Sequence, residues 1–149
     1  MTVEMTDTDT PTPTGIDWAA LHEAALAALE HAYAPYSNYP VGAAALVDDG
    51  RLITGANVEN ASYGLTLCAE CSLVSALHMG GGGRLVAFVC VNGAGDVIMP
   101  CGRCRQLLYE HSAEGMVCDT VSGLRTIDQV IPDAFGPRDL QTAASGGGA

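Results

Sequence analysis

Two short cysteine-containing segments constrain this chain more than any other feature of its sequence. Cys68 and Cys71 enclose Ala-Glu, and Cys101 and Cys104 follow Pro100 with Gly-Arg between them. Each segment lies where the sequence predicts the start of a helix, and the free N–H groups and partial positive charge of a helix N-terminus stabilise thiolates. If the fold brings both helix ends together, three or four thiolates surround one soft cation, for which zinc is the usual choice.

The cysteines alone leave two kinds of zinc site open. In a structural site all four cysteines bind, whereas in a catalytic site three bind and water takes the fourth position. The 29 residues between the pairs, 72–100, exceed the roughly 15–20 that are usual in a four-cysteine structural site. The chain after Cys71 continues in a helical pattern without a glycine for a turn, and Glu70 has an obvious role only in catalysis. These features favour the catalytic site.

Charge and composition disfavour several classes of partner. The 149 residues include six arginines, no lysine and 17 acidic residues, for a net charge of −11. Such a chain lacks the basic surface that neutralises phosphates, so we expect no nucleic-acid partner. Its longest purely apolar run, 85–91, is far shorter than the roughly 20 residues that span a bilayer. With no basic N-terminal signal pattern, we expect a cytoplasmic protein whose six cysteines do not form disulfides.

Hydrophobic periodicity predicts one domain over 15–142, between disordered tails at 1–14 and 143–149. The expected helices are 16–33, 67–79, 101–111 and 127–131, and the expected strands are 41–47, 51–58, 85–91, 116–121 and 124–126. Asp48-Asp49-Gly50 makes the first two strands a hairpin, and the last two are too close for a parallel crossover. The pattern predicts an α/β fold, a three-layer α/β/α sandwich on a mixed sheet of about five strands.

Cys-Ala-Glu at 68–70 followed by Pro-Cys-x-x-Cys at 100–104 resembles the zinc-dependent nucleoside and nucleobase deaminases. Three more segments are similar to the branch that acts on free nucleosides, the cytidine deaminase family: Ala-Pro-Tyr-Ser at 34–37, Val-Gly-Ala-Ala at 41–44 and Asn-Val-Glu-Asn-Ala-Ser-Tyr-Gly at 57–64. The resemblance runs from about residue 16 to residue 135. It implies a cytidine deaminase-like fold and a homotetramer with active sites shared between subunits.

The resemblance also implies a reaction and the residues that carry it out. Cys68, Cys101 and Cys104 would hold one Zn²⁺ per subunit, and Glu70 would be the proton shuttle. The expected reaction is hydrolytic deamination of cytidine and 2′-deoxycytidine to uridine and 2′-deoxyuridine plus ammonia, by zinc-activated hydroxide, in pyrimidine salvage.

Substrate contacts follow in part from strand geometry. Asn57 and Glu59 fall on one face at the end of the second expected strand, where an amide and a carboxylate can hold a sugar hydroxyl. The resemblance implies that they bind the 3′-hydroxyl of ribose and that the backbone of Ala69 binds the pyrimidine. A solvated strand end is the alternative for the first two residues.

The resemblance assigns the remaining contacts to residues near or across a subunit interface. Tyr39 would line the pocket, Phe135 would pack on the base from a neighbouring subunit, and Ala61 and Tyr63 would contact the 5′ side of the sugar. For the three aromatic residues, ordinary core or interface packing is the alternative.

One position departs from the family pattern. Many relatives with three cysteine ligands have an arginine directly after the glutamate, where this chain has Cys71. Because three thiolates and Zn²⁺ sum to −1, some positive charge must offset them, and we expect the helix ends, Arg103 or Arg105 to supply it. Our hypothesis is that Cys71 is not a ligand. We assign no histidine to the metal, and expect Cys90 and Cys118 to be small core residues.

The residues leave two other functions possible. Within the superfamily, the substrate could be deoxycytidylate, tRNA or a modified cytosine compound, although the acidic charge argues against tRNA. Outside it, the chain could be a non-catalytic zinc module in a larger assembly.

Overall fold

The structure is a computed structural model that describes residues 15–145. The predicted tail at 1–14 and residues 146–149 of the second predicted tail lie outside the described range.

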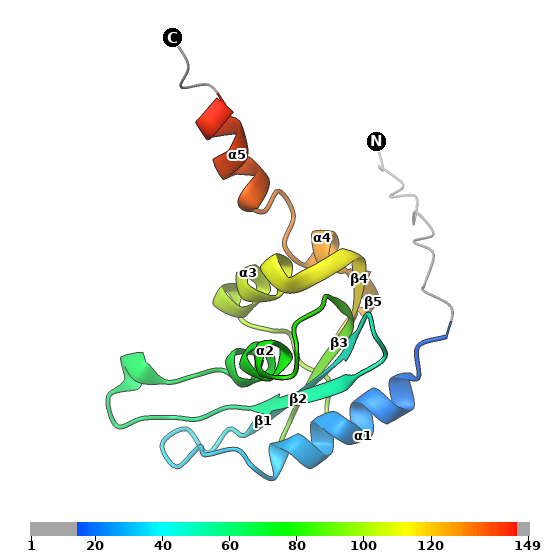
Figure 1. The fold of residues 1–149 in the computed structure, drawn as a ribbon. Helices are drawn as coiled ribbons and strands as arrows, with labels where there is room; N and C mark the ends of the chain where they lie inside the picture. The colour runs from blue at the N-terminus through cyan, green and yellow to red at the C-terminus, as the bar shows by residue number, and fades with distance from the viewer. Residues whose placement is uncertain (1–14, 146–149) are drawn as a thin grey trace, which may run out of the picture.

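A five-stranded sheet forms the middle layer (Figure 1). Its strands are β1 (Val41–Val47), β2 (Leu52–Ala56), β3 (Leu85–Asn92), β4 (Ser112–Thr120) and β5 (Gly123–Thr126), in the order β2-β1-β3-β4-β5. Only β3 and β4 pair in parallel; the other neighbours, including β4 and β5, are antiparallel. The mixed sheet that the sequence predicts is confirmed.

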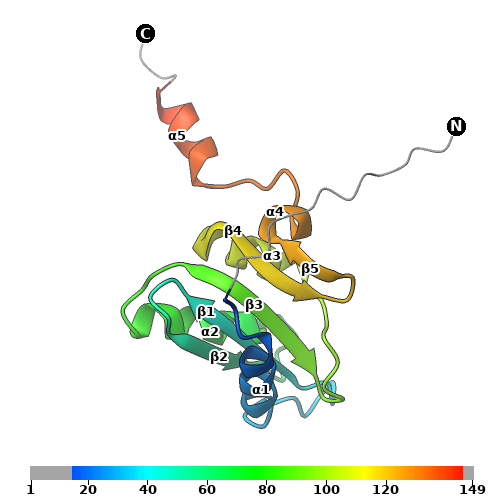
Figure 2. The same cartoon turned by 90° about the vertical axis from the view of Figure 1, so that its right-hand side faces the viewer.

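Helices cover both faces of this sheet (Figure 2). α1 (Trp18–Leu29) packs on one face, where its Leu21 and Ala25 meet strand residues such as Val89 and Val91. α2 (Ala69–Met79), α3 (Gly102–His111) and α4 (Ile127–Val130) lie on the other face over a second core layer. The three-layer α/β/α sandwich is therefore confirmed. Within residues 15–145, no helix has both the length and the apolar character needed to cross a membrane.

Cys90 and Cys118 lie in the second core layer and are fully buried, as the sequence predicts. Burial raises the pKa of the Cys118 thiol to about 12. Both side chains therefore act as small apolar core residues rather than as reactive thiols.

The first turn of α2 rests directly on β2 because residue 55 has no side chain. A Cβ atom on Gly55 would lie 2.2 Å from the carbonyl oxygen of Ala69 and 2.6 Å from the amide nitrogen of Leu73. The Ser72 hydroxyl adds polar links here, since it accepts a hydrogen bond from the Ala56 amide at 3.0 Å and lies 3.0 Å from the Ala69 carbonyl oxygen, to which it donates. The sheet thus fixes the position at which α2 begins.

Several boundaries differ from the sequence prediction. β4 begins at Ser112, directly after α3, because Ser112 pairs with Leu85 of β3 although residues 112–115 have no apolar pattern to reveal a strand. β2 ends at Ala56, and the chain beyond it stays extended only through single bridges from Val58 to Tyr33 and Leu67. α1 ends at Leu29, four residues before the predicted end.

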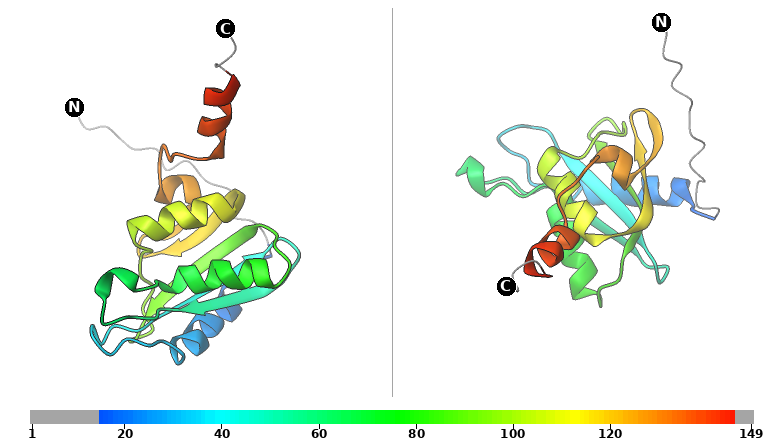
Figure 3. Two further views of the ribbon diagram at one scale, coloured as in Figure 1. Left: turned by 60° about the vertical axis from the view of Figure 1, so that its left-hand side comes forward. Right: turned by 90° about the horizontal axis from the view of Figure 1, so that it is seen from above.

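A fifth helix, α5 (Pro137–Ser145), is not predicted by the sequence and continues three residues into the segment 143–149, for which a disordered tail is expected. Pro137 takes the first helical position, and the Asp139 carboxylate accepts a hydrogen bond from the Gly136 amide at 2.7 Å. Both are helix-start features. Figure 3 shows α5 pointing away from the sandwich.

Replacing Gly55 by alanine is expected to lower the free energy of unfolding by about 1–3 kcal/mol, because the new Cβ overlaps backbone atoms of α2. Gly64→Ala is the matched control, since a Cβ there meets no atom within 4 Å. Thermal denaturation of both variants measures the difference. Equal melting temperatures for the two variants would contradict the conclusion that α2 packs directly against the backbone of Gly55.

Candidate active site

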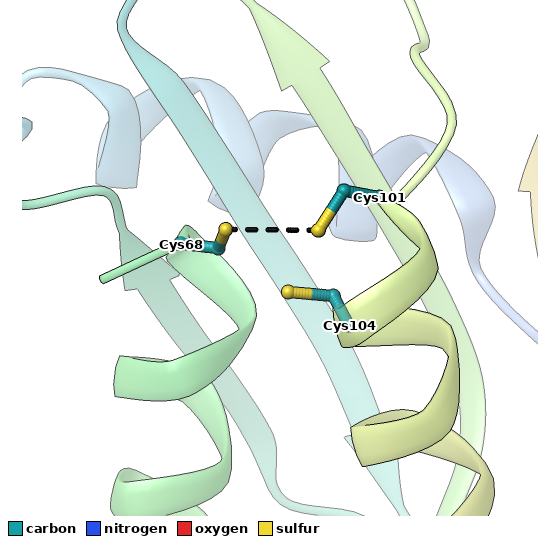
Figure 4. A group of neighbouring side chains, drawn as sticks. All are labelled: Cys68, Cys101 and Cys104. Carbon is teal, nitrogen blue, oxygen red and sulfur yellow. Dashed lines mark hydrogen bonds between the residues drawn. The ribbon is translucent and has the colours of Figure 1, made fainter. Parts of the chain in front are cut away.

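The N-termini of α2 and α3 meet, and each begins with a cysteine (Figure 4). Cys68 is the N-cap residue of α2 and Cys101 is the N-cap residue of α3, and neither side chain makes a capping hydrogen bond. N-cap side chains are usually polar groups that accept from the first-turn amides. Here the two thiols instead face each other, with their Sγ atoms 3.8 Å apart, and Cys104 adds a third sulfur from the first turn of α3.

These three sulfurs fit a zinc ion. The Sγ atoms of Cys68, Cys101 and Cys104 all lie within 4.8 Å of one another. Two Zn–S bonds of 2.3 Å at a tetrahedral angle place their sulfurs about 3.8 Å apart. That is the distance between Cys68 and Cys101. In the part of the chain that the structure describes, this is the one cluster of three or more ligating side chains, and Cys71 is not in it.

Burial controls the protonation of the thiols. Desolvation raises the pKa of Cys68 and of Cys104, and the negative charge of Glu70 raises the pKa of Cys104 further. Burial opposes ionisation of Cys101 too, but its interactions with Cys104 and Cys68 together outweigh burial, so the pKa of Cys101 lies below its ordinary value. Because the thiolate is the ligand, a metal that enters must displace protons from Cys68 and Cys104.

Glu70 lies in the first turn of α2 and is only 3% exposed. Its charge raises the pKa values of the thiols of Cys68 and Cys104, alongside the larger effect of burial, so the carboxylate is close to the cluster. An acid group at a helix N-terminus is favourably placed with respect to the helix dipole. A buried carboxylate beside a metal with an open position can move protons to and from a bound reactant.

Cys71 has a partner of its own. A guanidinium nitrogen of Arg103, Nη2, donates a hydrogen bond to the Cys71 sulfur at 3.3 Å. This bond and the charges of Cys71, Cys68 and Cys104 raise the pKa of Arg103, which places its positive charge beside the cluster. Of the two arginines that the sequence left open, Arg103 is therefore the one that faces the cysteines.

Arg105 points elsewhere. Its guanidinium donates to the carbonyl oxygen of Pro100 at 2.8 Å and to that of Val130 at 3.2 Å. It therefore links the backbone that precedes Cys101 to the end of α4 through hydrogen bonds.

Glu59 is bound to the loop after α1. Its carboxylate accepts hydrogen bonds from the backbone amides of Tyr36 and Ser37 at 2.9 Å and 3.2 Å, and from the Ser37 hydroxyl. The bond from the Ser37 hydroxyl is the main cause that lowers the pKa of Glu59. The carboxylate thus stays ionised and partly exposed at the rim of the loop.

Asn57 is the buried neighbour of this group, at 9% exposure. Its carbonyl oxygen accepts from the Val41 amide at 2.8 Å, and its amide nitrogen donates to the Tyr39 carbonyl at 3.0 Å. Asn57 therefore fixes the course of residues 39–41, a role that the strand-end pattern did not reveal.

Glu59 and Tyr63 line a cavity of about 300 Å³ together with Tyr36, Ser37 and Thr66. The rings of Tyr36 and Tyr63 meet edge to face with centroids 5.9 Å apart. Sequence reasoning assigned no role to Tyr36, Ser37 or Thr66, although the Ala-Pro-Tyr-Ser segment was the available signal for two of them.

The other expected substrate residues are not brought to this cavity within one chain. Tyr39, Ala61 and Phe135 are exposed, and none of them lines the cavity. Phe135 is held by its backbone, whose carbonyl oxygen accepts from the Gln106 side chain at 2.7 Å. Ala69, by contrast, is fully buried at the start of α2, between Cys68 and Glu70.

Comparison with known proteins places these features in a family. The family model described as "Cytidine and deoxycytidylate deaminase zinc-binding region" matches residues 17–120, which include all three clustered cysteines. A cytidine deaminase from Mycobacterium tuberculosis is 58% identical over 125 residues, which cover 84% of this chain and 94% of the relative. One from Halalkalibacterium halodurans is 39% identical over 134 residues, covering 84% and 98%.

Solved structures of cytidine deaminases resemble this chain in fold as well as in sequence. The crystal structure of cytidine deaminase from Mycobacterium leprae superimposes with a TM-score of 0.78 at 61% identity and covers 79% of this chain and 99% of that one. That from Burkholderia pseudomallei has a TM-score of 0.72 at 39% identity, with coverage of 80% and 100%. The three-sulfur cluster accounts for one Zn²⁺ per subunit. The chain therefore belongs to the zinc-dependent cytidine and deoxycytidylate deaminase family.

Proposed function

We propose that this protein hydrolyses cytidine and 2′-deoxycytidine to uridine and 2′-deoxyuridine with release of ammonia, as a step of pyrimidine salvage in the cytoplasm. The observation that carries the proposal is the meeting of two helix N-termini, which brings three sulfurs to zinc spacing beside the buried carboxylate of Glu70. The relatives named cytidine deaminase support the choice of substrate.

Cys68, Cys101 and Cys104 hold the metal in this proposal. Zinc with three protein ligands supplies an activated water, whose pKa it lowers to about 7. Glu70 accepts the proton of the attacking water, transfers it to N3 of the cytosine ring, and then helps to protonate the departing amino group. The water oxygen becomes the carbonyl oxygen at C4, and ammonia leaves. The backbone of Ala69, beside Glu70, orients the pyrimidine.

The sugar is assigned to Glu59, which lines the loop cavity, and to the neighbouring Asn57, which is not among the residues that line it. Glu59 and Asn57 bind the 3′-hydroxyl of ribose, and the hydrogen bonds that they already make hold residues 36–41 in place around it. Among the described residues of one chain, no arginine lines the cavity beside Glu59, which favours a free nucleoside over deoxycytidylate, whose 5′-phosphate needs a cation.

Arg103 compensates the charge of the metal centre in this proposal. Three thiolates and Zn²⁺ carry a net negative charge that weakens the activation of water. The Arg103–Cys71 hydrogen bond brings a guanidinium to the cluster at the position where many relatives have an arginine after the glutamate. Cys71 is thus the anchor of a positive charge rather than a fourth ligand.

We also propose that the active form is a homotetramer whose sites are shared between subunits. Large apolar side chains are exposed around the loop cavity and on the segment after α4, where a single chain leaves them in water; they include Tyr36, Tyr39, Val58, Tyr63, Leu65, Leu67 and Phe135. Exposed apolar patches of this kind mark protein interfaces. In such an assembly Tyr39 lines the pocket, Ala61 and Tyr63 approach the 5′ side of the sugar, and Phe135 packs on the base.

Glu70→Gln is expected to keep its zinc and to lose roughly 10²–10⁴-fold in kcat, because the amide cannot carry the proton. Turnover is measured by the ultraviolet change as cytidine becomes uridine, with deoxycytidylate as a parallel substrate. Glu114→Gln, at an exposed position on β4, is the control and keeps full activity. An active Glu70→Gln enzyme, or wild-type protein without activity on either nucleoside, would refute the proposed function.

Cys71→Ala and Cys104→Ala form a matched pair for the ligand set. We expect Cys71→Ala to retain one zinc per subunit, because its sulfur lies outside the cluster, and Cys104→Ala to lose most of it. Metal analysis of the purified variants measures the content directly. Zinc lost equally from both variants would indicate a four-sulfur structural site.

Shared sites can be tested by combining two defective subunits. Phe135→Ala and Glu70→Gln are each expected to impair activity when expressed alone. Co-expressed subunits are expected to form mixed oligomers in which some sites have both native residues. We expect part of the activity to return in the mixture. If the mixture is no more active than the two variants measured separately, Phe135 acts within its own subunit or has no part in the site.

A further inference from the structure

The opposite ends of the same two helices hold a pair of histidines that the proposed reaction does not use. His78 lies in the last turn of α2 and His111 in the last turn of α3. The Nε2 atom of His78 is 3.3 Å from the Nδ1 atom of His111. The two rings meet edge to face, with centroids 4.9 Å apart and an angle of 76° between their planes.

This separation suits a shared metal ion. Two metal–nitrogen bonds of about 2.1 Å at a tetrahedral angle place the nitrogens about 3.4 Å apart. The hydrogen bond that joins the rings needs small rotations to turn both lone pairs toward one point, and the exposed ring of His78 is free to make them. The pair therefore offers two ligands from different helices at a suitable spacing before any metal arrives.

The surrounding charges favour a cation. Both histidines lie at helix C-termini, where the carbonyl groups give a partial negative charge. Burial and the proximity of His78 lower the pKa of His111, so its ring is neutral at neutral pH and able to bind a metal. Glu110 acts in the opposite direction on His111, whereas Arg84, which donates to the Glu110 carbonyl at 2.5 Å, adds to the lowering.

We propose that His78 and His111 form a second metal site, which takes one divalent transition metal ion that prefers nitrogen ligands, such as Ni²⁺, Cu²⁺ or Zn²⁺. Water fills the remaining coordination positions, since the pair lies at the surface. A metal bound there joins the C-terminal ends of the helices whose N-terminal ends hold the three-cysteine cluster. The inference does not depend on the proposed function, because the two histidines lie at the opposite ends of α2 and α3 from that cluster.

Titration of zinc-loaded, untagged protein with Ni²⁺ tests the site by calorimetry at neutral pH. We expect one Ni²⁺ per subunit in the wild type and an affinity at least about tenfold weaker, or about 1.4 kcal/mol, in both His78→Gln and His111→Gln. His31→Gln is the matched control, because His31 is exposed and lies outside the pair. Ni²⁺ is also expected to raise the melting temperature of the wild type and of His31→Gln, but not that of the two site variants.

Three results would overturn this proposal. The first is a wild-type protein that takes up no Ni²⁺ beyond its zinc. The second is wild-type affinity in either site variant, and the third is an equal loss of affinity in His31→Gln. Zinc content and deaminase activity measured without Ni²⁺ establish that the variants are folded, so that a weaker affinity reports on the histidine pair itself.

Discussion

The structure depends on the side-by-side start of two helices. β2 and β3 both run antiparallel to β1 and therefore end at the same edge of the sheet, and α2 and α3 each begin beyond one of these ends. Their N-termini are thus brought together by sheet topology, and Gly55 lets α2 lie close enough to the sheet for the arrangement to hold. Two positive helix ends then face three cysteine sulfurs, and this interaction favours the thiolate form that a metal ion binds.

The paired cysteines explain why so much of the site could be predicted. Their spacing fixes which sulfurs share a helix turn, and the apolar pattern after each pair predicts the helices correctly. The antiparallel last hairpin also followed from a local constraint, the short turn between β4 and β5. Features of this kind depend on residues close together in the sequence, which is why the fold class and the meeting of the cysteines at two helix starts could be predicted from the pattern. The choice of three of the four cysteines came from the resemblance to the family.

What sequence reasoning missed depends on contacts between distant segments. Nothing in the sequence distinguishes Arg103 from Arg105 as the partner of the cluster, because the choice rests on which way each side chain turns from α3. For Asn57 and Glu59 the sequence leaves a sugar site or a solvated strand end open, and it gives no sign that much of their hydrogen bonding fixes the loop of residues 36–41. α5 has start signals at Pro137 and Asp139, but no helix is predicted there from the sequence.

The use of cysteine at both N-cap positions has a cost for the metal-free chain. The first-turn amides of α2 and α3 receive no side-chain acceptor from Cys68 or Cys101, so the two helix starts lack the capping that polar residues normally provide. Binding of a metal ion by the three sulfurs would therefore have two effects. It would complete the reactive centre, and it would fix the starts of both helices. We therefore expect the two helix starts to fray, and to be cleaved more easily by proteases, when the chain is made without enough zinc.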